Sequence, residues 1–426
     1  MNELIELLRN NESVNGYKIT EKKTHSCELF FVHEKLETVR TTDTTDVTVT
    51  VYADHDGARG DSSFALTAAT TKTELKEKID LAVKRARLSF SPPYALPKGG
   101  VVPARELPSN LAMEDEKTTA AKIARAAFDA KRPDGGSINA LEVFLYTDTV
   151  RVINSEGIDK TAIKRHAMVE AIPTYTDEND SVELYDDHYF TLFDEEAFKK
   201  EISEKLFEVY ERRLAVKPPV PLTVNVLLRP AEIRELLEAL IEDRNYATIF
   251  AHANLYSVGD DLQKDGAGDK LTLTCRAATP GSVNSAFFDG DGTDLTDVTL
   301  IKDGVIVSDY GGDRFGQYLG VKRPTGELRC MKLEPGTLTE EELRNAPHIE
   351  CASLSGIQID PYNDYIGGEI RLGYCFDGKT TVPVSGITMS GKLSEALKAL
   401  RLSAETKISG CYEGPGLMLL PGFTVL

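Results

Sequence analysis

The sequence has no tryptophan, few cysteines and no CxxC pair. Without closely spaced cysteines a zinc ribbon is excluded on spacing, and a disulfide framework is disfavoured. Scattered cysteines of this kind are typical of reduced thiols, which predicts a cytoplasmic location. The six cysteines are Cys27, Cys275, Cys330, Cys351, Cys375 and Cys411.

Long apolar runs and a basic leader are missing too. No segment approaches the roughly 20 apolar residues of a membrane span, and the opening MNELIELLRNNESV has acids where a signal peptide is basic. Lys and Arg total 49 against 68 Asp and Glu, which gives a net charge of -19. Because this charge repels phosphate backbones, we expect no direct binding of nucleic acid, and the lack of a long apolar run predicts no membrane partner.

Motifs for metals and phosphates are also lacking. The seven histidines stand far apart, and no two share a helical turn, so no histidine-based metal site is predicted. There is no GxxxxGK phosphate loop. The segment FDGDGTDLTD, residues 288–297, lacks the order of acids and the closing Glu of an EF-hand, so we predict a turn with solvated acids; a calcium site is the alternative.

The chain is too long for one ordinary core, which favours two or three domains. Residues 1–215 mix alternating strand patterns with helical ones, whereas strand patterns dominate after the proline-rich VKPPVPL at 216–222. We therefore predict an α+β fold. An N-terminal α+β domain (1–215) has an antiparallel sheet with helices, and a strand-rich C-terminal domain (222–426) resembles a barrel or a sandwich.

The segment RPAEIRELLEALIED, residues 229–243, is predicted to be a helix that buries one face. Leu236 and Leu240 lie one turn apart on an apolar stripe. A catalytic metal would need histidines here, and there are none. The stripe consists of Ile233, Leu236, Leu237, Leu240 and Ile241, and the acids predicted to be solvated are Glu232, Glu235, Glu238 and Glu242.

Cys411, in ISGCYEGPG, is the one candidate nucleophile. A thiol needs a base to become a thiolate, and the sequence does not show whether a histidine lies near it. A packed or merely exposed thiol is the competing interpretation. The sequence leaves both interpretations of Cys411 open.

Several segments are informative through their shared order and spacing. They are LETVRTTDTTDVTVTVYADHDGARGDSSF, VINSEG, VNVLLRPAEIRELLEAL, PGSVNSAFFDGDGTDLTDVTLIKDGVIVSDY, VPVSGITMSGKLSEALKAL and ISGCYEGPGLMLLPGF, and together they cover most of the chain. In this order and spacing they resemble the TldD/PmbA family, which is described as modulators of DNA gyrase and as metallopeptidases.

The resemblance implies a function and a missing site. TldD-like members carry HExxxH on the helix that corresponds to residues 231–243, and its histidines bind zinc. This chain has PAEIREL there, which resembles the PmbA (TldE-like) branch, whose members pair with a zinc-bearing TldD-like subunit. Cys411 falls at the family's cysteine ligand, where it would be vestigial.

We therefore expect a non-metal, TldE-like subunit of a cytoplasmic TldD/TldE metallopeptidase that acts on unfolded or leader peptides. This chain would carry no catalytic, metal-binding or cofactor-binding residue, and zinc would belong to a TldD-like partner. It would form dimers with that partner or with itself. The alternatives are a thiol hydrolase that uses Cys411, and a non-enzymatic acidic protein that interacts with others and affects DNA gyrase.

Overall fold

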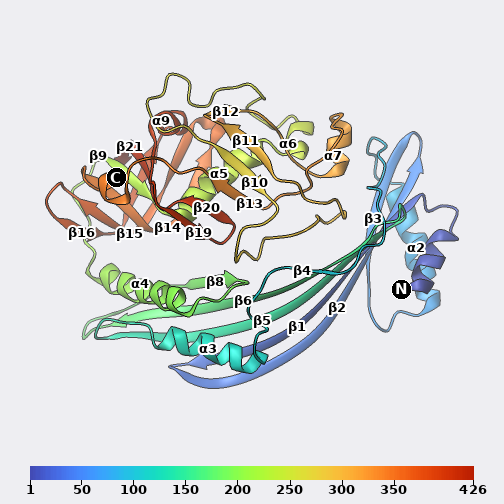
Figure 1. The fold of residues 1–426 in the computed structure, drawn as a ribbon, viewed down its shortest axis with the longest axis horizontal. Coiled ribbons are helices and arrows are strands. Elements are labelled where there is room, and N and C mark those ends of the chain that lie inside the picture. Colours follow the sequence, from blue (N-terminus) through green and yellow to red (C-terminus); the bar gives the residue numbers. More distant parts are fainter.

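The computed structural model describes residues 1–426 as a mixed α+β chain, which confirms the predicted fold class. The N-terminal half is one long, curved antiparallel sheet (Figure 1). Its spatial order is β3 (Ala58–Leu66), β2 (Lys35–His55), β1 (Gly16–Val32), β5 (Gly136–Asn154) and β6 (Asp159–Thr176), and β6 also pairs with the short strands β4 (Arg105–Glu106), β7 (Ser181–Glu183) and β8 (Asp186–Phe190).

Four helices accompany this sheet. At one end α1 and α2 build a core with β1, β2 and β3, and at the other end α3 and α4 build a second core with β1, β5 and β6. Thr71 caps α2, and Glu74 completes a capping box, so local sequence fixes where that helix begins. The helices are α1 (Asn2–Arg9), α2 (Lys72–Ala86), α3 (Glu116–Phe128) and α4 (Glu195–Leu214).

The middle of β2 alternates valine with other residues, and Val49 and Val51 are buried. However, Thr50 and Tyr52 on the other face are buried as well. Tyr52 packs edge-on against Tyr94, whose segment crosses that face, with 6.2 Å between ring centroids. This part of β2 is therefore covered on both faces, although its sequence alternates like that of a half-buried strand.

The C-terminal half is strand-rich and barrel-like, as expected. One sheet has the order β12-β11-β10-β13-β20-β19 and the other β14-β9-β21-β17-β15-β16, with β18 beside β21. The strands are β9 (Leu222–Leu228), β10 (Leu273–Arg276), β11 (Val298–Lys302), β12 (Val305–Ile306), β13 (Cys330–Leu333), β14 (His348–Asp360), β15 (Tyr365–Phe376), β16 (Thr381–Val384), β17 (Ile387–Gly391), β18 (Arg401–Leu402), β19 (Thr406–Ser409), β20 (Tyr412–Pro415) and β21 (Met418–Val425).

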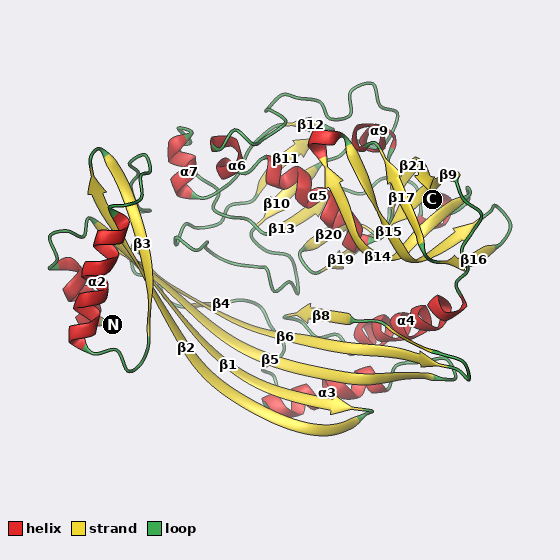
Figure 2. Ribbon diagram, turned by 180° about the vertical axis from the view of Figure 1, so that it is seen from behind, coloured by secondary structure: helices red, strands yellow, loops and turns green.

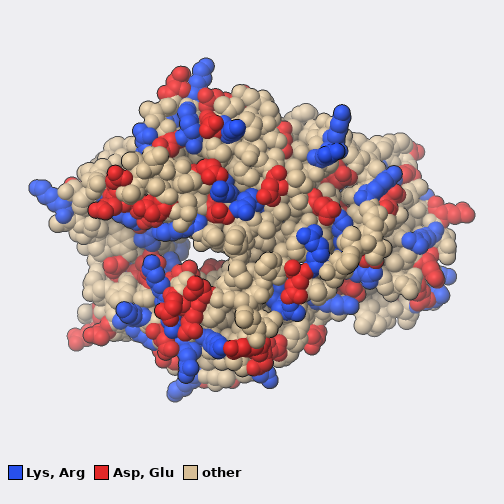
Figure 3. Space-filling model, in the orientation of Figure 1, with Lys and Arg blue, Asp and Glu red and all other residues tan.

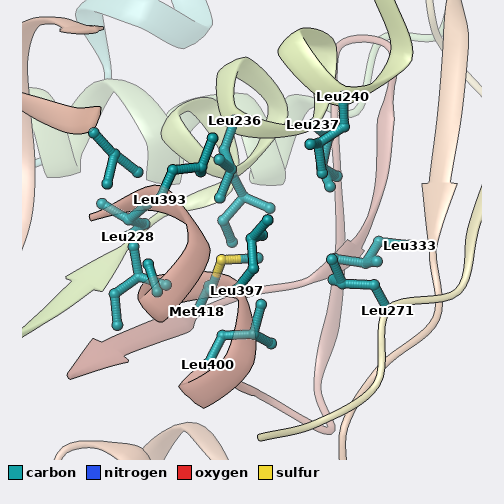
Figure 4. Packing of buried hydrophobic residues seen from close by; sticks show 14 of the residues in the cluster. Leu228, Leu236, Leu237, Leu240, Leu271, Leu333, Leu393, Leu397, Leu400 and Met418 are labelled. Atoms are coloured by element: carbon teal, nitrogen blue, oxygen red, sulfur yellow. The ribbon is translucent and has the colours of Figure 1, made fainter. Parts of the chain in front are cut away.

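Helices fill the space between these sheets. One cluster of 35 buried hydrophobic residues joins α5, α9 and strands of both sheets. Leu236, Leu237 and Leu240 point from α5 into this core (Figure 4), so the predicted apolar stripe is confirmed. The helices are α5 (Pro230–Asp243), α6 (Tyr246–Phe250), α7 (Asp313–Tyr318), α8 (Glu340–Leu343) and α9 (Leu393–Ala399), with a 3-10 turn at Pro361–Asn363.

The C-terminal half rests on the N-terminal sheet at separated places, and the space-filling view shows an opening between the two halves (Figure 3). At one end Arg229 donates to Glu208 of α4 at 2.6 Å. At the other end Tyr318 of α7 donates to the carbonyl of Pro92 at 2.7 Å. No helix is both long enough and apolar enough to cross a membrane. The division of the chain at 216–222 into independent domains stays a prediction.

Candidate functional site

Helix α5 and Cys411 meet at a cavity of about 390 Å³, although they are far apart in the sequence. α5 lies between β14 on one side and β19 and β20 on the other. Cys411 occupies the turn from β19 to β20, and the start of β13 completes the wall. The lining residues are Glu238, Ile241, Glu242, Cys275, Asn284, Tyr310, Leu328, Arg329, Cys330, Met331 and Cys411.

Three of the six cysteines line this cavity, and all three are buried. The backbone N–H of Met331 donates to the carbonyl of Cys411 at 2.9 Å, and β13 runs parallel to β20, so Cys411, just before β20, lies beside the start of β13 at Cys330. Burial raises the pKa of the Cys275 thiol to about 12 and also raises that of Cys330. These two thiols are therefore neutral at physiological pH and behave as small apolar groups.

The cavity does not fit a three-ligand zinc site. None of its lining residues is a histidine, and no three His, Cys, Asp or Glu side chains of the chain are placed to hold a metal ion together. Glu238 is engaged by Arg234 of the same helix at 2.9 Å. The expected absence of a metal-binding residue in this chain, including a vestigial Cys411, stays a prediction.

The acidic face of α5 is less exposed than predicted. Glu232 is half-buried, and its Oε2 atom has no hydrogen-bond partner. Burial raises the pKa of this carboxyl to about 7. Glu235 accepts from the backbone N–H of Ile357 in β14 at 3.4 Å. The expectation of a solvated acidic face was wrong for Glu232, because strands of both sheets flank the helix.

The acidic segment 288–297 is also not a freely solvated turn. The side chain of Asp289 is buried and accepts N–H groups of Asp291 and Thr293 at 2.9 and 3.0 Å, which shapes the loop. Asp291 pairs with Lys18, and Asp294 accepts from Lys160 at 2.8 Å. The prediction was therefore wrong for Asp289, whereas Asp294 and Asp297 are exposed. Lys18 and Lys160, distant in sequence, project from the N-terminal sheet onto the loop.

The same sheet face carries a polar cluster near the cavity, which sequence reasoning missed. Lys164 donates to the carbonyl of Val283, one residue before the lining residue Asn284. Beside it, Asp148 accepts from Thr24 at 2.5 Å and contacts His166 at 3.3 Å. Burial alone would raise the pKa of Asp148, but these hydrogen bonds outweigh it and lower the pKa to about 2. Only the alternation of polar residues along β1, β5 and β6 could have indicated this face.

The long curved sheet supports a barrel-like domain over a cavity, so the molecule has a two-part architecture. Comparisons with known proteins indicate the family of this molecule. Residues 221–425 match the family described as PmbA/TldA metallopeptidase C-terminal domain. The C-terminal part of the chain therefore belongs to the TldD/PmbA family. No curated protein matches the sequence.

Solved structures share the fold over essentially the whole chain. A candidate modulator of a DNA gyrase from Thermotoga maritima is 16% identical with a TM-score of 0.77, covering 100% of this chain and 99% of that one. A second candidate modulator, from Bacteroides thetaiotaomicron, is 14% identical with a TM-score of 0.80, covering 100% and 97%. TldE from Thermococcus kodakarensis is 14% identical with a TM-score of 0.77, covering 99% of each chain. At these identities the likeness shows the fold alone.

Proposed function

We propose that this chain is a non-metal, TldE-like subunit of a cytoplasmic TldD/TldE metallopeptidase. It holds unfolded or leader peptides, and a zinc-bearing TldD-like partner cleaves them. The observation that carries the proposal is the composition of the cavity between α5 and Cys411, which offers thiols and carboxylates but no imidazole. A zinc site normally combines three protein ligands with a water, and this cavity does not supply that set.

Peptide holding is supported by strand edges near the opening. β8 pairs only with β6, and β19 pairs only with β20, so each leaves one edge free. Both views place β8 and β19 on opposite sides of the space between the two halves (Figures 1 and 2). An extended peptide can bind such an edge through its backbone, which accepts many sequences because the hydrogen bonds do not involve side chains.

The thiol-hydrolase alternative gains no support from the cavity. Cys411 is buried, and none of the lining residues is a histidine that could take its proton. The gyrase alternative rests on the names of two proteins that share the fold, and no feature of this chain favours it over peptide holding.

The test combines metal analysis with reconstitution. We expect the purified chain to contain no stoichiometric zinc and to leave an unfolded peptide intact. Mixing it with a TldD-like chain that retains HExxxH should produce cleavage that neither subunit gives alone. Cys411→Ser is the matched control and should change neither result. Near-stoichiometric zinc that is lost in Cys411→Ser, or cleavage by the chain alone, would overturn the proposal.

A further inference from the structure

The cavity between α5 and Cys411 carries opposite charges on two of its walls. On the α5 wall, Glu238 and Glu242 lie one helical turn apart. On another wall, Arg329 comes directly before β13. No ion pair joins Arg329 to either carboxylate, so the two kinds of charge stay separate. A cavity with this distribution suits a ligand that itself carries both charges.

The basic wall has a guanidinium without a partner. Arg329 is exposed, and its side chain forms no ion pair and no hydrogen bond within the chain. Lys164 lies nearby, since it donates to the carbonyl of Val283, one residue before the lining residue Asn284, at 2.6 Å. Burial lowers the pKa of Lys164, and the positive charge of Arg329 acts in the same direction. Arg329 is therefore placed to bind a carboxylate beside a second cation.

The acidic wall has one carboxylate that no cation neutralises. Glu238 is paired with Arg234 of the same helix at 2.9 Å. Glu242 is exposed and accepts the hydroxyl of Thr248 at 3.0 Å, which leaves its charge uncompensated. A carboxylate in this state is a strong acceptor for an ammonium group. Glu242 is therefore the complement of Arg329 for a ligand with two charged ends.

The rest of the lining sets the size and polarity of the ligand. Ile241, Leu328 and Met331 contribute apolar surface, and the cavity volume is about 390 Å³. Pockets that bind small molecules measure roughly 300 to 1,000 Å³ and are lined mainly by apolar groups. A free amino acid has one carbon between its charges, whereas a dipeptide separates them by a peptide unit. Charges on separate walls therefore favour the dipeptide.

We propose that this cavity binds a short peptide with both ends free, best a dipeptide with apolar side chains. Its carboxylate lies at Arg329, its ammonium group at Glu242, and its side chains against the apolar lining. The inference rests on the proposed function only for the source of the ligand, because cleavage by a TldD-like partner would release such fragments. Binding itself requires neither zinc nor the partner.

Calorimetric titration of the purified full-length chain with leucyl-leucine tests the proposal. The dipeptide should bind saturably. N-acetyl-leucyl-leucine and leucyl-leucine amide each lack one charge, so each should bind about tenfold more weakly. Free leucine should lose a similar factor, because its two charges cannot reach both walls at once.

Two variants assign the ends of the ligand. Arg329→Gln should weaken leucyl-leucine about tenfold and leave the affinity for the amide at the parent's level, because the amide has no carboxylate. Glu242→Gln should do the same with the acetylated dipeptide as the insensitive ligand. Arg371→Gln and Glu369→Gln are the matched controls, since both residues are exposed on β15 and form no ion pair. Both controls should bind like the parent, and all four variants should melt like it.

Three outcomes would overturn the proposal. A parent chain that does not bind leucyl-leucine at millimolar concentration removes the ligand. Equal affinity for the free and the blocked dipeptides shows that the charged walls are not used. A loss in Arg371→Gln that equals the loss in Arg329→Gln assigns the effect to net charge.

Failure of this inference is distinguishable from failure of the proposed function. A chain that supports cleavage with a TldD-like partner but does not bind leucyl-leucine refutes the dipeptide site alone. A chain that binds leucyl-leucine through Arg329 and Glu242 but never supports cleavage refutes the proposed function and its source of the ligand, while the site stands.

Discussion

The two halves of this molecule are stabilised differently. The C-terminal half closes around one apolar cluster of 35 buried residues, into which α5 inserts its leucines. The N-terminal sheet has two separate clusters, of 18 and 13 residues, and its helices are also attached through ionisable pairs such as His188 of β8 with Glu201 of α4. Apolar packing does not depend on pH, whereas hydrogen-bonded imidazoles do. A compact core and a long sheet with open edges should therefore respond differently to mutation and pH.

The largest expected effect is in the C-terminal core. Leu236→Ala should lower the free energy of unfolding by roughly 2 to 5 kcal/mol, because Leu236 is fully buried and the core cannot collapse onto the space left behind. Leu81→Ala, at a side chain that is 45% exposed, is the control and should cost far less. Thermal and urea denaturation of the two variants measures both losses of unfolding free energy. Equal losses would show that the core is not as closely packed as described.

The next largest loss of stability is expected at the junction of the two halves. Arg229 binds Glu208 of α4 and Glu350 of β14, whose side chains are 6% and 9% exposed. Arg229→Met should cost about 2 kcal/mol, because two buried carboxylates lose a partner while Lys205 and Arg344 remain beside them. Lys200→Met removes an exposed pair and should change the melt by less than about 0.5 kcal/mol. An equal loss of stability in Arg229→Met and Lys200→Met would contradict the role of Arg229 as a partner of two buried carboxylates.

The N-terminal half should weaken at alkaline pH. Burial alone would lower the pKa of His188, but hydrogen bonds with Asp186 and Glu201 outweigh it and raise the pKa to about 9. Its stabilisation is complete below the unfolded pKa of about 6.5 and disappears as pH rises through 9, a loss on the order of 2 kcal/mol. His188→Gln should melt below the parent at pH 6 and close to it at pH 9.5. A constant difference would show that His188 does not titrate in this range.

The smallest effect is expected on the acidic side of α5. Glu235 and Glu238 are 39% and 45% exposed, so Glu235→Gln and Glu238→Gln should each change stability by only about 0.5 kcal/mol. Cleavage by the complex reconstituted with a TldD-like chain should stay nearly unchanged. A glutamine variant that melts like the parent but loses most of the activity would mean that this helix takes part in the chemistry.

Helices with strong local signals were predictable from the sequence. Leu75, Ile79 and Val83 recur with a helical period, which predicts α2, and all three are buried. The proline-rich segment 216–222, after which strand patterns dominate, likewise follows directly on the end of α4. Such features depend on neighbours within a few residues, so a sequence contains most of the information that specifies them.

The candidate site was predictable only in part. The absence of histidines from α5 and the presence of Cys411 could be read directly from the sequence. Their meeting at one cavity with Cys330 could not, because β13 and β20 pair across a long stretch of chain. The burial of Glu232 was missed for the same reason, since strands far away in sequence flank its helix.

The sequence by itself therefore determined the α+β class, the principal helices, the family resemblance and the lack of a histidine pair on α5, because these depend on residue identity and short-range periodicity. Only the tertiary structure decided which carboxylates face lysines, which thiols share a cavity and which strand edge stays free. Those features depend on how separate elements pack, and a sequence pattern specifies which face of an element is buried but not which distant residue covers it.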